Sequence, residues 1–344
     1  MSTVEINASK RYNVIIEKGA LSKVGELAKE IIGQCRAVII TDDKVDALYS
    51  ATLTASLEKS GFDVIKFVFE NGEKSKNFDT YKNIIDFLAA NRIGRKDTIF
   101  ALGGGVVGDM AGFASATYLR GIRFIQLPTT LLAAVDSSVG GKTAIDLAYG
   151  KNLLGAFYQP ELVVCDTNTL NTLDKNVFSD GCAEVIKYGA ISDDVIFDLM
   201  KSPESLDIDL IIRRCVEAKR NVVVEDEFES GLRQILNFGH TFGHAVEKLS
   251  NYKIPHGSAV AIGMAIIMRA SAPGEYADKL ISLLEKYNLP TKTDFRADEL
   301  FEAVLSDKKR YADKITLVLP IKEGECMLCN KSLSEAKEIL SKGL

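Results

Sequence analysis

The chain has 344 residues, of which 47% are hydrophobic and 26% charged, and its formal net charge is −5. This length and apolar content predict roughly two globular domains and exclude a disordered chain. The chain lacks the basic stretches typical of nucleic-acid binding, and no uncharged apolar run reaches the roughly 18 residues that cross a bilayer, so we expect a cytoplasmic protein without nucleic-acid or membrane partners.

Short apolar runs alternate with helical patterns through the first half of the chain. This alternation predicts a mostly parallel sheet with crossover helices. The predicted strands lie at residues 14–17, 37–40, 63–69, 98–102, 122–128 and 162–166. The pattern then becomes helical almost throughout, apart from a hairpin-like stretch at 314–328. We therefore place a boundary near Asn176, with an α/β domain at 1–176 and a helical domain at 177–344.

Polar residues and glycines follow several of these strands, where parallel sheets bind ligands. Three glycines end the strand at 98–102, and a helix carrying Asp109 begins near Val106. The spacing of Gly103, Gly105 and Gly108 fits G-x-G-x-x-G, although the acidic residue that completes a Rossmann fingerprint about 20 positions later is missing. This turn favours a nucleotide phosphate at a helix N-terminus.

A Gly-Gly-Lys-Thr run near Lys142 resembles the end of a P-loop. A P-loop needs glycine at position 136, where Asp136 stands, and residues 131–135 read as a helical turn, so an NTPase is rejected. Asp136, Lys142, Lys151 and Asn152 are instead interpreted as a polar cluster that binds a ligand.

All three histidines lie in one short segment of the second half. If this segment is one helix, Arg233, Asn237, His240 and His244 share a face at offsets 0, 4, 7 and 11. His256 follows a short break and begins another apolar helix, which could return its ring to that face. Two or three imidazoles would then converge.

Imidazoles joined by one carboxylate form the ligand set of a catalytic zinc site. Glu184 is a candidate third ligand, because it shares a helical stripe with Asp180 and Lys187, the latter a candidate substrate contact. Thr241 occupies the position where a zincin would carry its catalytic glutamate, so a metalloprotease is excluded. Spacing alone leaves open which histidines bind the metal.

The six cysteines are dispersed, mostly within apolar runs, as expected for buried thiols in a reducing compartment. Cys326 and Cys329 form a lone pair at metal-knuckle spacing. No second pair or nearby histidine accompanies them, so a metal site is not predicted there.

Long runs of the chain closely resemble the dehydroquinate synthase family of sugar-phosphate cyclases, which are related to glycerol dehydrogenases. The matching segments span about residues 42–309 and follow the family's order. They are GGGVVGDMAGFASATYLRG, LPTTLLAAVDSSVGGKTAID, GKNLLGAFYQP, GCAEVIKYG, LNFGHTFGHAVE and HGSAVAIGM. One departure is Ser258, where the family usually has glutamate, and we expect altered support for His256 without loss of activity.

The resemblance implies a dinucleotide-binding α/β domain, a C-terminal all-α domain and an active site in the cleft between them. It implies that Glu184, His240 and His256 bind Zn²⁺ or Co²⁺, whereas His244 lies on the substrate side. The residues implied for NAD are Asp42, Asn71, Gly72, Glu73, Lys74, Lys76, Gly104, Gly105, Val106, Asp109, Thr129, Thr130, Lys142, Lys151, Thr169, Leu170, Asn171 and Thr172.

The implied substrate is a seven-carbon keto sugar acid phosphate, whose anionic groups suit ammonium and guanidinium partners. The residues implied to hold it are Asp136, Lys142, Asn152, Lys187, Lys219, Arg233, Asn237, His244, Lys308 and Lys309, with Arg120 acting across a homodimer interface.

The implied reaction is the second step of the shikimate pathway, from 3-deoxy-D-arabino-heptulosonate 7-phosphate to 3-dehydroquinate and phosphate. It combines transient oxidation by NAD, phosphate elimination, reduction and aldol closure. Alternatives are a hexose-phosphate cyclase such as 2-deoxy-scyllo-inosose synthase, a glycerol dehydrogenase-like oxidoreductase that releases NADH, and an inactive metal-binding scaffold.

Overall fold

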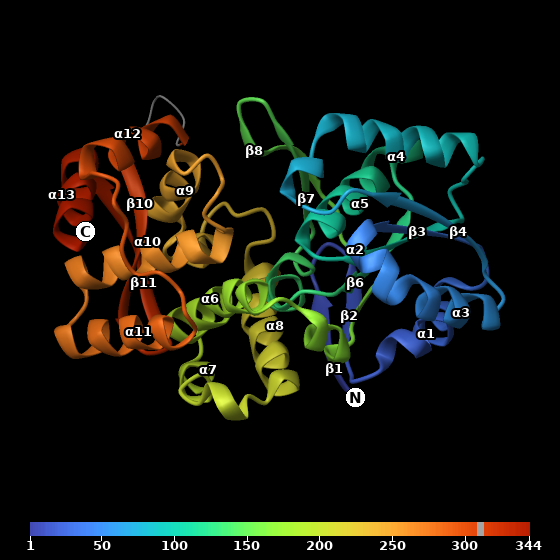
Figure 1. Cartoon of the computed structure of the whole chain (residues 1–344), viewed down its shortest axis with the longest axis horizontal. Helices are drawn as coiled ribbons and strands as arrows, with labels where there is room; N and C mark the ends of the chain where they lie inside the picture. Colours follow the sequence, from blue (N-terminus) through green and yellow to red (C-terminus); the bar gives the residue numbers. More distant parts are fainter. Residues whose placement is uncertain (308–312) are drawn as a thin grey trace. The chain divides into compact units, whose positions relative to one another are not determined.

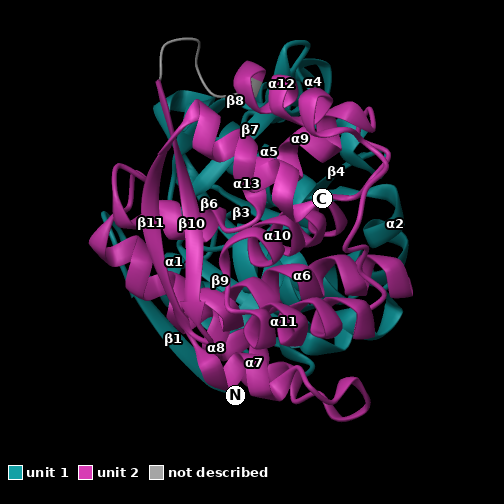
Figure 2. Cartoon of the chain, turned by 90° about the vertical axis from the view of Figure 1, so that its left-hand side faces the viewer, with its two compact units in different colours: residues 1–173 teal, residues 174–344 magenta. Residues whose placement is uncertain are grey.

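The computed structural model describes residues 1–307 and 313–344. The chain folds into two compact units, unit 1 at Met1–Leu173 and unit 2 at Asp174–Leu344, which Figure 2 colours separately. The boundary predicted near Asn176 falls at the start of unit 2. In the described part of the chain, no helix is long and apolar enough to cross a membrane.

Unit 1 is built on a seven-stranded sheet in the order β1-β2-β9-β6-β5-β3-β4. Figure 1 labels β1, β2, β3, β4 and β6 of this sheet. Every neighbouring pair is parallel except β1 and β2. The strands are β1 (Ser2–Asn7), β2 (Arg11–Ile16), β3 (Arg36–Asp42), β4 (Asp63–Phe69), β5 (Thr98–Gly103), β6 (Arg123–Pro128) and β9 (Leu162–Cys165). The six predicted strands are confirmed, whereas the antiparallel edge strand β1 was not predicted.

Helices cover both faces of this sheet, because each face carries its own apolar cluster. On one face, α1 (Val24–Ile32) and α3 (Ala51–Lys59) pack against β-strand residues such as Ile39. On the other, α4 (Phe78–Ala90) and α5 (Gly105–Thr117) pack against residues such as Ile40.

The short α2 (Asp43–Val45) follows β3, and residues 131–137 are helical, as predicted for 131–135.

A second, two-stranded sheet in unit 1 was not predicted. It pairs β7 (Lys142–Leu147) with β8 (Gly150–Phe157), and the turn between them carries Tyr149, which is 94% exposed. The sequence interpretation assigned these residues only to a polar cluster, because their pattern lacks a clear two-residue alternation.

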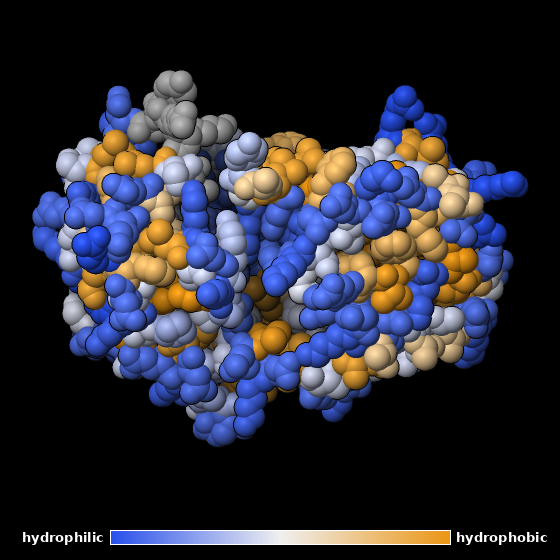
Figure 3. Space-filling model, turned by 45° about the horizontal axis from the view of Figure 1, so that its top comes forward, coloured by the Kyte–Doolittle hydropathy of each residue, from blue (hydrophilic) through white to orange (hydrophobic). Residues whose placement is uncertain are grey.

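Figure 3 shows polar and charged residues predominating on one face of the molecule, with apolar residues in small groups.

Unit 2 is helical, as predicted, and also contains the predicted hairpin. Its helices are α6 (Lys175–Ile191), α7 (Asp194–Leu199), α8 (Ile208–Glu225), α9 (His240–Leu249), α10 (His256–Ser271), α11 (Gly274–Lys286), α12 (Ala297–Asp307) and α13 (Leu333–Gly343). The hairpin joins β10 (Lys314–Lys322) to β11 (Glu325–Ser332). Helix α10 is buried along most of its length and packs against α6, α9, α11 and α13, so it forms the centre of the unit.

The prediction of one continuous helix from Arg233 through His244 is wrong. A 3₁₀ helix at Leu232–Asn237 ends before Gly239, whose φ of 78° is left-handed, and α9 begins at His240. A Cβ at Gly239 would lie 2.5 Å from Met264 Cγ and 2.7 Å from the Val260 carbonyl oxygen of α10. The helix therefore breaks where a glycine lets the chain pass close to α10.

Candidate metal centre and dinucleotide site

Three predicted metal ligands converge in unit 2, although they come from three helices. Glu184 lies on α6, His240 begins α9 and His256 begins α10. The Glu184 Oε1 atom lies 3.6 Å from His240 Nε2 and 3.3 Å from His256 Nε2. One donor atom from each residue falls within 4.8 Å of the others, which is the arrangement of a three-ligand cation site.

Both histidines use their other ring nitrogen in a second contact. The His240 Nδ1 atom lies 3.0 Å from the Phe238 carbonyl oxygen, and His256 Nδ1 lies 3.2 Å from Glu247 Oε2. When Nδ1–H is the donor in each contact, the neutral form of each ring presents the Nε2 lone pair. Such contacts orient metal-binding imidazoles and fix the nitrogen that they present.

Electrostatics also prepare this cluster for a cation. Burial, with the neighbouring Lys187 and histidines, lowers the pKa of His240 well below its usual value, so its ring is neutral. Burial acts against a charge on His256 as well, but the Glu184 and Glu247 carboxylates raise its pKa to about 10. The two carboxylates thus favour positive charge at His256.

The donor set fits a divalent metal. Glu184 is only 1% exposed, so its carboxylate is almost fully removed from water. Its close neighbours are the two imidazoles and Lys187, which forms an ion pair with Oε2. A buried carboxylate needs a cationic partner, and two imidazoles with one carboxylate are typical zinc ligands.

The predicted substrate residues of unit 2 lie on neighbouring segments. Lys187, Lys219 and Arg233 are each at least 96% buried, from α6, α8 and the 3₁₀ helix. His244 is exposed, and its ring centroid lies 5.5 Å from that of His240. Asn237 is half-buried and donates through Nδ2 to Glu229 Oε1 at 3.0 Å. Lys308 and Lys309 lie outside the described residues.

A carboxylate-centred loop holds Arg233. Asp226 accepts hydrogen bonds from the backbone N–H groups of Ser230, Gly231 and Arg233 at 2.8–2.9 Å. Burial would raise the pKa of Asp226, but these donors lower it to about 2. The Arg233 guanidinium in turn donates to the Glu227 carbonyl oxygen. The loop therefore fixes both the backbone and the side chain of Arg233.

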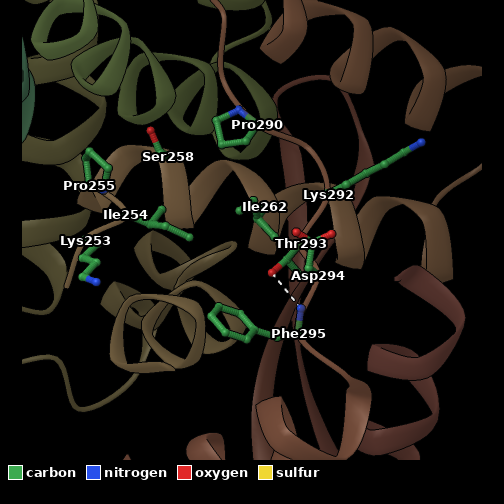
Figure 4. Close-up of a pocket in the computed structure, with 10 residues that line it drawn as sticks. All are labelled: Lys253, Ile254, Pro255, Ser258, Ile262, Pro290, Lys292, Thr293, Asp294 and Phe295. Atoms are coloured by element: carbon green, nitrogen blue, oxygen red, sulfur yellow. Dashed lines mark hydrogen bonds between the residues drawn. The ribbon is translucent and has the colours of Figure 1, made fainter. Parts of the chain in front are cut away.

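A cavity of about 460 Å³ lies beside the start of α10. Figure 4 shows Ile254, Ile262 and Phe295 pointing toward its interior, with Pro255 and Ser258 at one side. Its lining includes the residues that flank His256 but none of the three predicted ligands. Its lining mixes apolar residues with polar ones such as Lys253 and Lys292, but includes none of the residues predicted to hold the substrate, so we do not assign the substrate to it.

In unit 1, the predicted cofactor residues gather at the carboxyl ends of the parallel strands. The connections reverse direction between the neighbouring strands β3 and β5, which end at Asp42 and Gly103. Such a reversal is where doubly wound sheets bind ligands. Helix α5 starts directly after this point at Gly105, and no side chain caps its N-terminus. Gly104, Gly105 and Val106 are half-buried there.

A charged network connects the next group of predicted residues. The Lys76 Nζ atom lies 2.6 Å from both Asp109 Oδ2 and Asn152 Oδ1, and Lys76 is 5% exposed. Lys151 pairs with Glu73 at 3.1 Å. Burial would lower the pKa of Lys76, but Asp109 and Glu73 raise it, so this lysine keeps its charge. Lys76 is therefore a buried, paired cation and not a solvated loop charge.

The remaining cofactor candidates follow the same strand ends. Thr129 Oγ1 is buried and has no hydrogen-bond partner among the described residues, so a ligand hydroxyl or amide could satisfy it. Tyr49 donates to the Thr169 carbonyl oxygen at 3.0 Å and contacts the Thr172 hydroxyl. Thr130 is half-buried, Leu170 is buried, and Asn71, Lys74 and Asn171 are exposed, whereas Gly72 is half-buried. These residues place several polar groups along the carboxyl ends of the strands.

The other predicted substrate residues also belong to unit 1. Asp136 is half-buried in the helical segment before β7, while Lys142 and Asn152 are exposed on the hairpin strands. Arg120 is exposed and has a left-handed φ of 67°. Their roles toward the substrate remain predictions.

Sequence reasoning missed Glu247, Glu229 and Asp226. Glu247 continues the stripe of His240 and His244, at offset 7 from His240, so helical spacing could have identified it. Glu229 and Asp226 lie in a loop, where no periodicity marks a functional side chain. Only the folded loop reveals their contacts.

Comparisons with known proteins agree with this arrangement. The 3-dehydroquinate synthase N-terminal family matches residues 66–180, and the C-terminal family matches residues 181–310. The 3-dehydroquinate synthase of Streptococcus suis is 44% identical over 342 residues, covering 96% of each chain. The Clostridium kluyveri protein of the same name is 43% identical over 349 residues, covering 97% of each chain.

Two solved cyclases share the fold. A 2-deoxy-scyllo-inosose synthase solved with carbaglucose-6-phosphate, NAD⁺ and Co²⁺ is 27% identical, with a TM-score of 0.87 and 100% of each chain covered. The 2-epi-5-epi-valiolone synthase from Streptomyces hygroscopicus, solved with NAD⁺ and Zn²⁺, is 25% identical, with a TM-score of 0.85 and 98% of each chain covered. The two family matches and the 43–44% identity over nearly the full length show that this chain belongs to the 3-dehydroquinate synthase family.

Proposed function

We propose that this enzyme converts 3-deoxy-D-arabino-heptulosonate 7-phosphate to 3-dehydroquinate and phosphate, using NAD and a divalent metal. Near-full-length identity to curated 3-dehydroquinate synthases supports the reaction. The converging Glu184, His240 and His256 side chains carry the metal part of the proposal. The two cyclases solved with NAD⁺ and Co²⁺ or Zn²⁺ support the same pair of cofactors.

When bound, NAD would supply a reversible hydride acceptor for a substrate carbinol, and a divalent cation would supply the Lewis acidity that makes that hydroxyl more acidic. The protein's own task is to orient the reacting groups and stabilise charge. Glu184, His240 and His256 would hold the cation, and the Phe238 carbonyl and Glu247 carboxylate keep both Nε2 atoms aimed at it.

The buried cations of unit 2 suit an anionic substrate. Lys187, Lys219 and Arg233 offer charge-assisted hydrogen bonds to carboxylate and phosphate oxygens. Removing these groups from water strengthens such contacts, because the effective dielectric constant falls. We assign recognition of the sugar acid phosphate to these residues, with Asp136, Lys142, Asn152 and the predicted Arg120, Lys308 and Lys309 completing the set.

Two further side chains would handle orientation and protons. Glu229 accepts from the Asn237 amide and so leaves the amide oxygen available to accept a hydrogen bond from a substrate hydroxyl. His244 combines an exposed ring with a position beside both ligand histidines. We propose that it contacts the substrate and exchanges a proton with it.

In unit 1, we propose that NAD binds along the carboxyl ends of the strands. The uncapped N-terminus of α5 after Gly104 suits the pyrophosphate, because its N–H groups and helix dipole favour an anion. Lys151, which Glu73 holds in an ion pair, would offer its ammonium group to the cofactor. The buried Thr129 hydroxyl would add a hydrogen bond to the cofactor. A homodimer in the cytoplasm remains a prediction from the resemblance and the dispersed cysteines.

The decisive experiment measures phosphate release from 3-deoxy-D-arabino-heptulosonate 7-phosphate with a catalytic amount of NAD, before and after chelator treatment. We expect release without net NADH, its loss after chelation and its return with Zn²⁺ or Co²⁺. A matched assay replaces the substrate with glucose 6-phosphate.

Each alternative has its own signature in this experiment. Turnover of glucose 6-phosphate, without turnover of the seven-carbon acid, would assign a hexose-phosphate cyclase. Steady NADH accumulation with glycerol would assign a net oxidoreductase. Undiminished release after complete metal removal would reject the proposed metal centre while leaving the cyclase reaction in place.

A further inference from the structure

Helix α10 begins at His256 without a capping side chain from its own segment. The preceding residue, Pro255, has no hydrogen-bonding side chain and makes no cap contact. The N–H groups in the first turn of a helix have no intrahelical acceptor, so they need partners from elsewhere. The first residue of this helix is also a predicted metal ligand, so the partner of this turn affects the metal centre.

Asp180 on the neighbouring helix α6 supplies the missing acceptor. Its Oδ1 atom accepts from the Ser258 backbone N–H at 2.7 Å and lies 3.2 Å from the Ser258 hydroxyl. Asp180 therefore acts as an N-cap from another helix, 78 positions away in sequence.

The backbones of the two helices meet at the same point. A Cβ on Gly257 would lie 2.0 Å from the Asp180 carbonyl oxygen and 2.7 Å from its carbonyl carbon. Only glycine allows this approach without a backbone shift. The carboxylate cap and the close backbone contact thus fix the start of α10 against α6.

This junction connects two predicted ligands. Asp180 lies four positions before Glu184, so both project from one face of α6, while His256 directly precedes Gly257. We propose that Asp180 is a positioning residue that holds His256 at metal-binding distance from Glu184 by capping α10. The inference rests on the metal centre of the proposed function and adds a residue to its support.

Small displacements at this junction have large consequences for metal binding. Ligand distances in metal sites vary within about 0.2 Å, so a small shift of one ligand weakens the site. Glu247 fixes the ring orientation of His256 through a contact with the ring itself, whereas Asp180 holds the backbone turn that carries the ring. Asp180 and Glu247 therefore restrain different parts of the same ligand.

Ser258 occupies the position where the family resemblance led us to expect glutamate and altered support for His256. The structure shows that its backbone and hydroxyl both donate to Asp180. The carboxylate beside this turn thus comes from α6. Loss of the Ser258 hydroxyl alone should have a small effect, since the backbone N–H donates regardless of side chain.

The test is Co²⁺ affinity of the full-length protein, measured by the visible absorption of the bound ion and by competition with a chelator. We expect Asp180→Ala to weaken Co²⁺ binding about 10- to 100-fold, the usual range for contacts that orient metal ligands. We expect Asp180→Asn to bind within about 3-fold of wild type, because asparagine is an equally good N-cap acceptor.

The matched control is Asp207→Ala, which removes the side-chain cap of α8 in the same unit. Asp207 accepts from the Leu210 N–H at 3.1 Å. A purely structural role for Asp180 predicts that both alanine variants lose thermal stability and that neither loses Co²⁺ affinity. Selective loss in Asp180→Ala, with recovery in Asp180→Asn, supports positioning.

The outcomes separate this inference from the proposed function. If wild type binds no Co²⁺, or Glu184→Gln binds it equally well, the metal centre itself is rejected. If wild type binds and Asp180→Ala binds equally well, only the positioning role is rejected. If Asp180→Ala does not fold, Asp180→Asn decides: Co²⁺ binding within about 3-fold of wild type supports hydrogen-bond capping, and weaker binding contradicts it.

Discussion

At the residue scale, three carboxylates act on different parts of His256. Glu184 faces Nε2, Glu247 faces Nδ1 and Asp180 caps the turn that follows the residue. A single imidazole is thereby fixed in tautomer, ring orientation and backbone position. Such restraint matters because a three-ligand site tolerates little error in any one donor.

The contact between Glu247 and His256 yields a prediction for metal affinity. Glu247→Ala should weaken Zn²⁺ or Co²⁺ binding about 10- to 100-fold, because the ring loses the acceptor that fixes its tautomer. Glu247→Gln keeps an oxygen acceptor and should lose less. Metal-competition titration measures both, with Glu217→Ala, at a half-buried position of α8, as the control. Equal affinity in Glu247→Ala and wild type would exclude this role.

The loop around Asp226 yields a prediction for pH. In the folded chain the pKa of Asp226 is lowered from 3.8 to about 2. The ionised carboxylate therefore stabilises the fold above about pH 3.8, and this stabilisation is lost as the pH falls toward 2. Asp226→Asn should destabilise the protein by roughly 1–2 kcal/mol near pH 6, since it loses a charged acceptor of several N–H groups.

Urea unfolding at about pH 6 and about pH 3 measures this difference. The difference in unfolding free energy between wild type and Asp226→Asn should narrow at the lower pH, because the Asp226 carboxylate of the unfolded chain, with its ordinary pKa of 3.8, takes up a proton before that of the folded chain. If the difference in unfolding free energy stays constant or grows at the lower pH, the lowered pKa of Asp226 does not contribute to stability. Substrate affinity should fall in the variant at the higher pH, because Asp226 orders the loop that carries Arg233.

At the element scale, close packing between α10 and the start of α9 places His240. Gly239 follows the 3₁₀ helix in a left-handed conformation, directly before the ligand. A Cβ there would meet both a side chain and a backbone carbonyl of α10. The break in the predicted helix is therefore a requirement of packing, and it turns His240 toward Glu184.

Gly239→Ala should lower the free energy of unfolding by about 2–5 kcal/mol, because it combines a left-handed backbone with overpacking against Met264. Chemical denaturation of the metal-free protein measures this loss separately from metal binding. Gly274→Ala provides the control, since a Cβ there meets no atom within 4 Å. Similar stability of both variants would contradict the packing explanation.

At the scale of the whole molecule, the two units carry different predicted ligands. The strand ends and α5 of unit 1 suit NAD, whereas the three metal ligands all belong to unit 2. Each ligand should stabilise the unit that binds it, because binding to the folded state opposes unfolding. The two effects can therefore be separated along the chain.

Hydrogen–deuterium exchange measures this separation. NAD at about 100 times its dissociation constant should protect residues 1–173 by up to about 2.7 kcal/mol, and Zn²⁺ at the same relative concentration should protect 174–344. A chelator should remove only the second protection. Protection of α6, α9 and α10 by NAD alone, without metal, would contradict the assignment.

Local patterns in the amino-acid sequence were enough to predict the alternating strands and helices of unit 1, the helical character of unit 2 and the shared stripe of Glu184 and Lys187. These features depend on residues within a few positions of one another, so periodicity reveals them. The long motifs identified the family, and the resemblance to that family identified the three predicted metal ligands. Spacing alone left His244 as an equal candidate.

What holds those ligands in place became visible only in the folded chain. Asp180 meets Ser258 from 78 positions away, Lys76 meets Asn152 across 76 positions, and Gly239 breaks its helix because α10 passes close by. Such contacts join segments that no local pattern relates, and their energies depend on burial and direction in the folded chain. The residue types therefore identified the chemistry, whereas tertiary packing set its geometry.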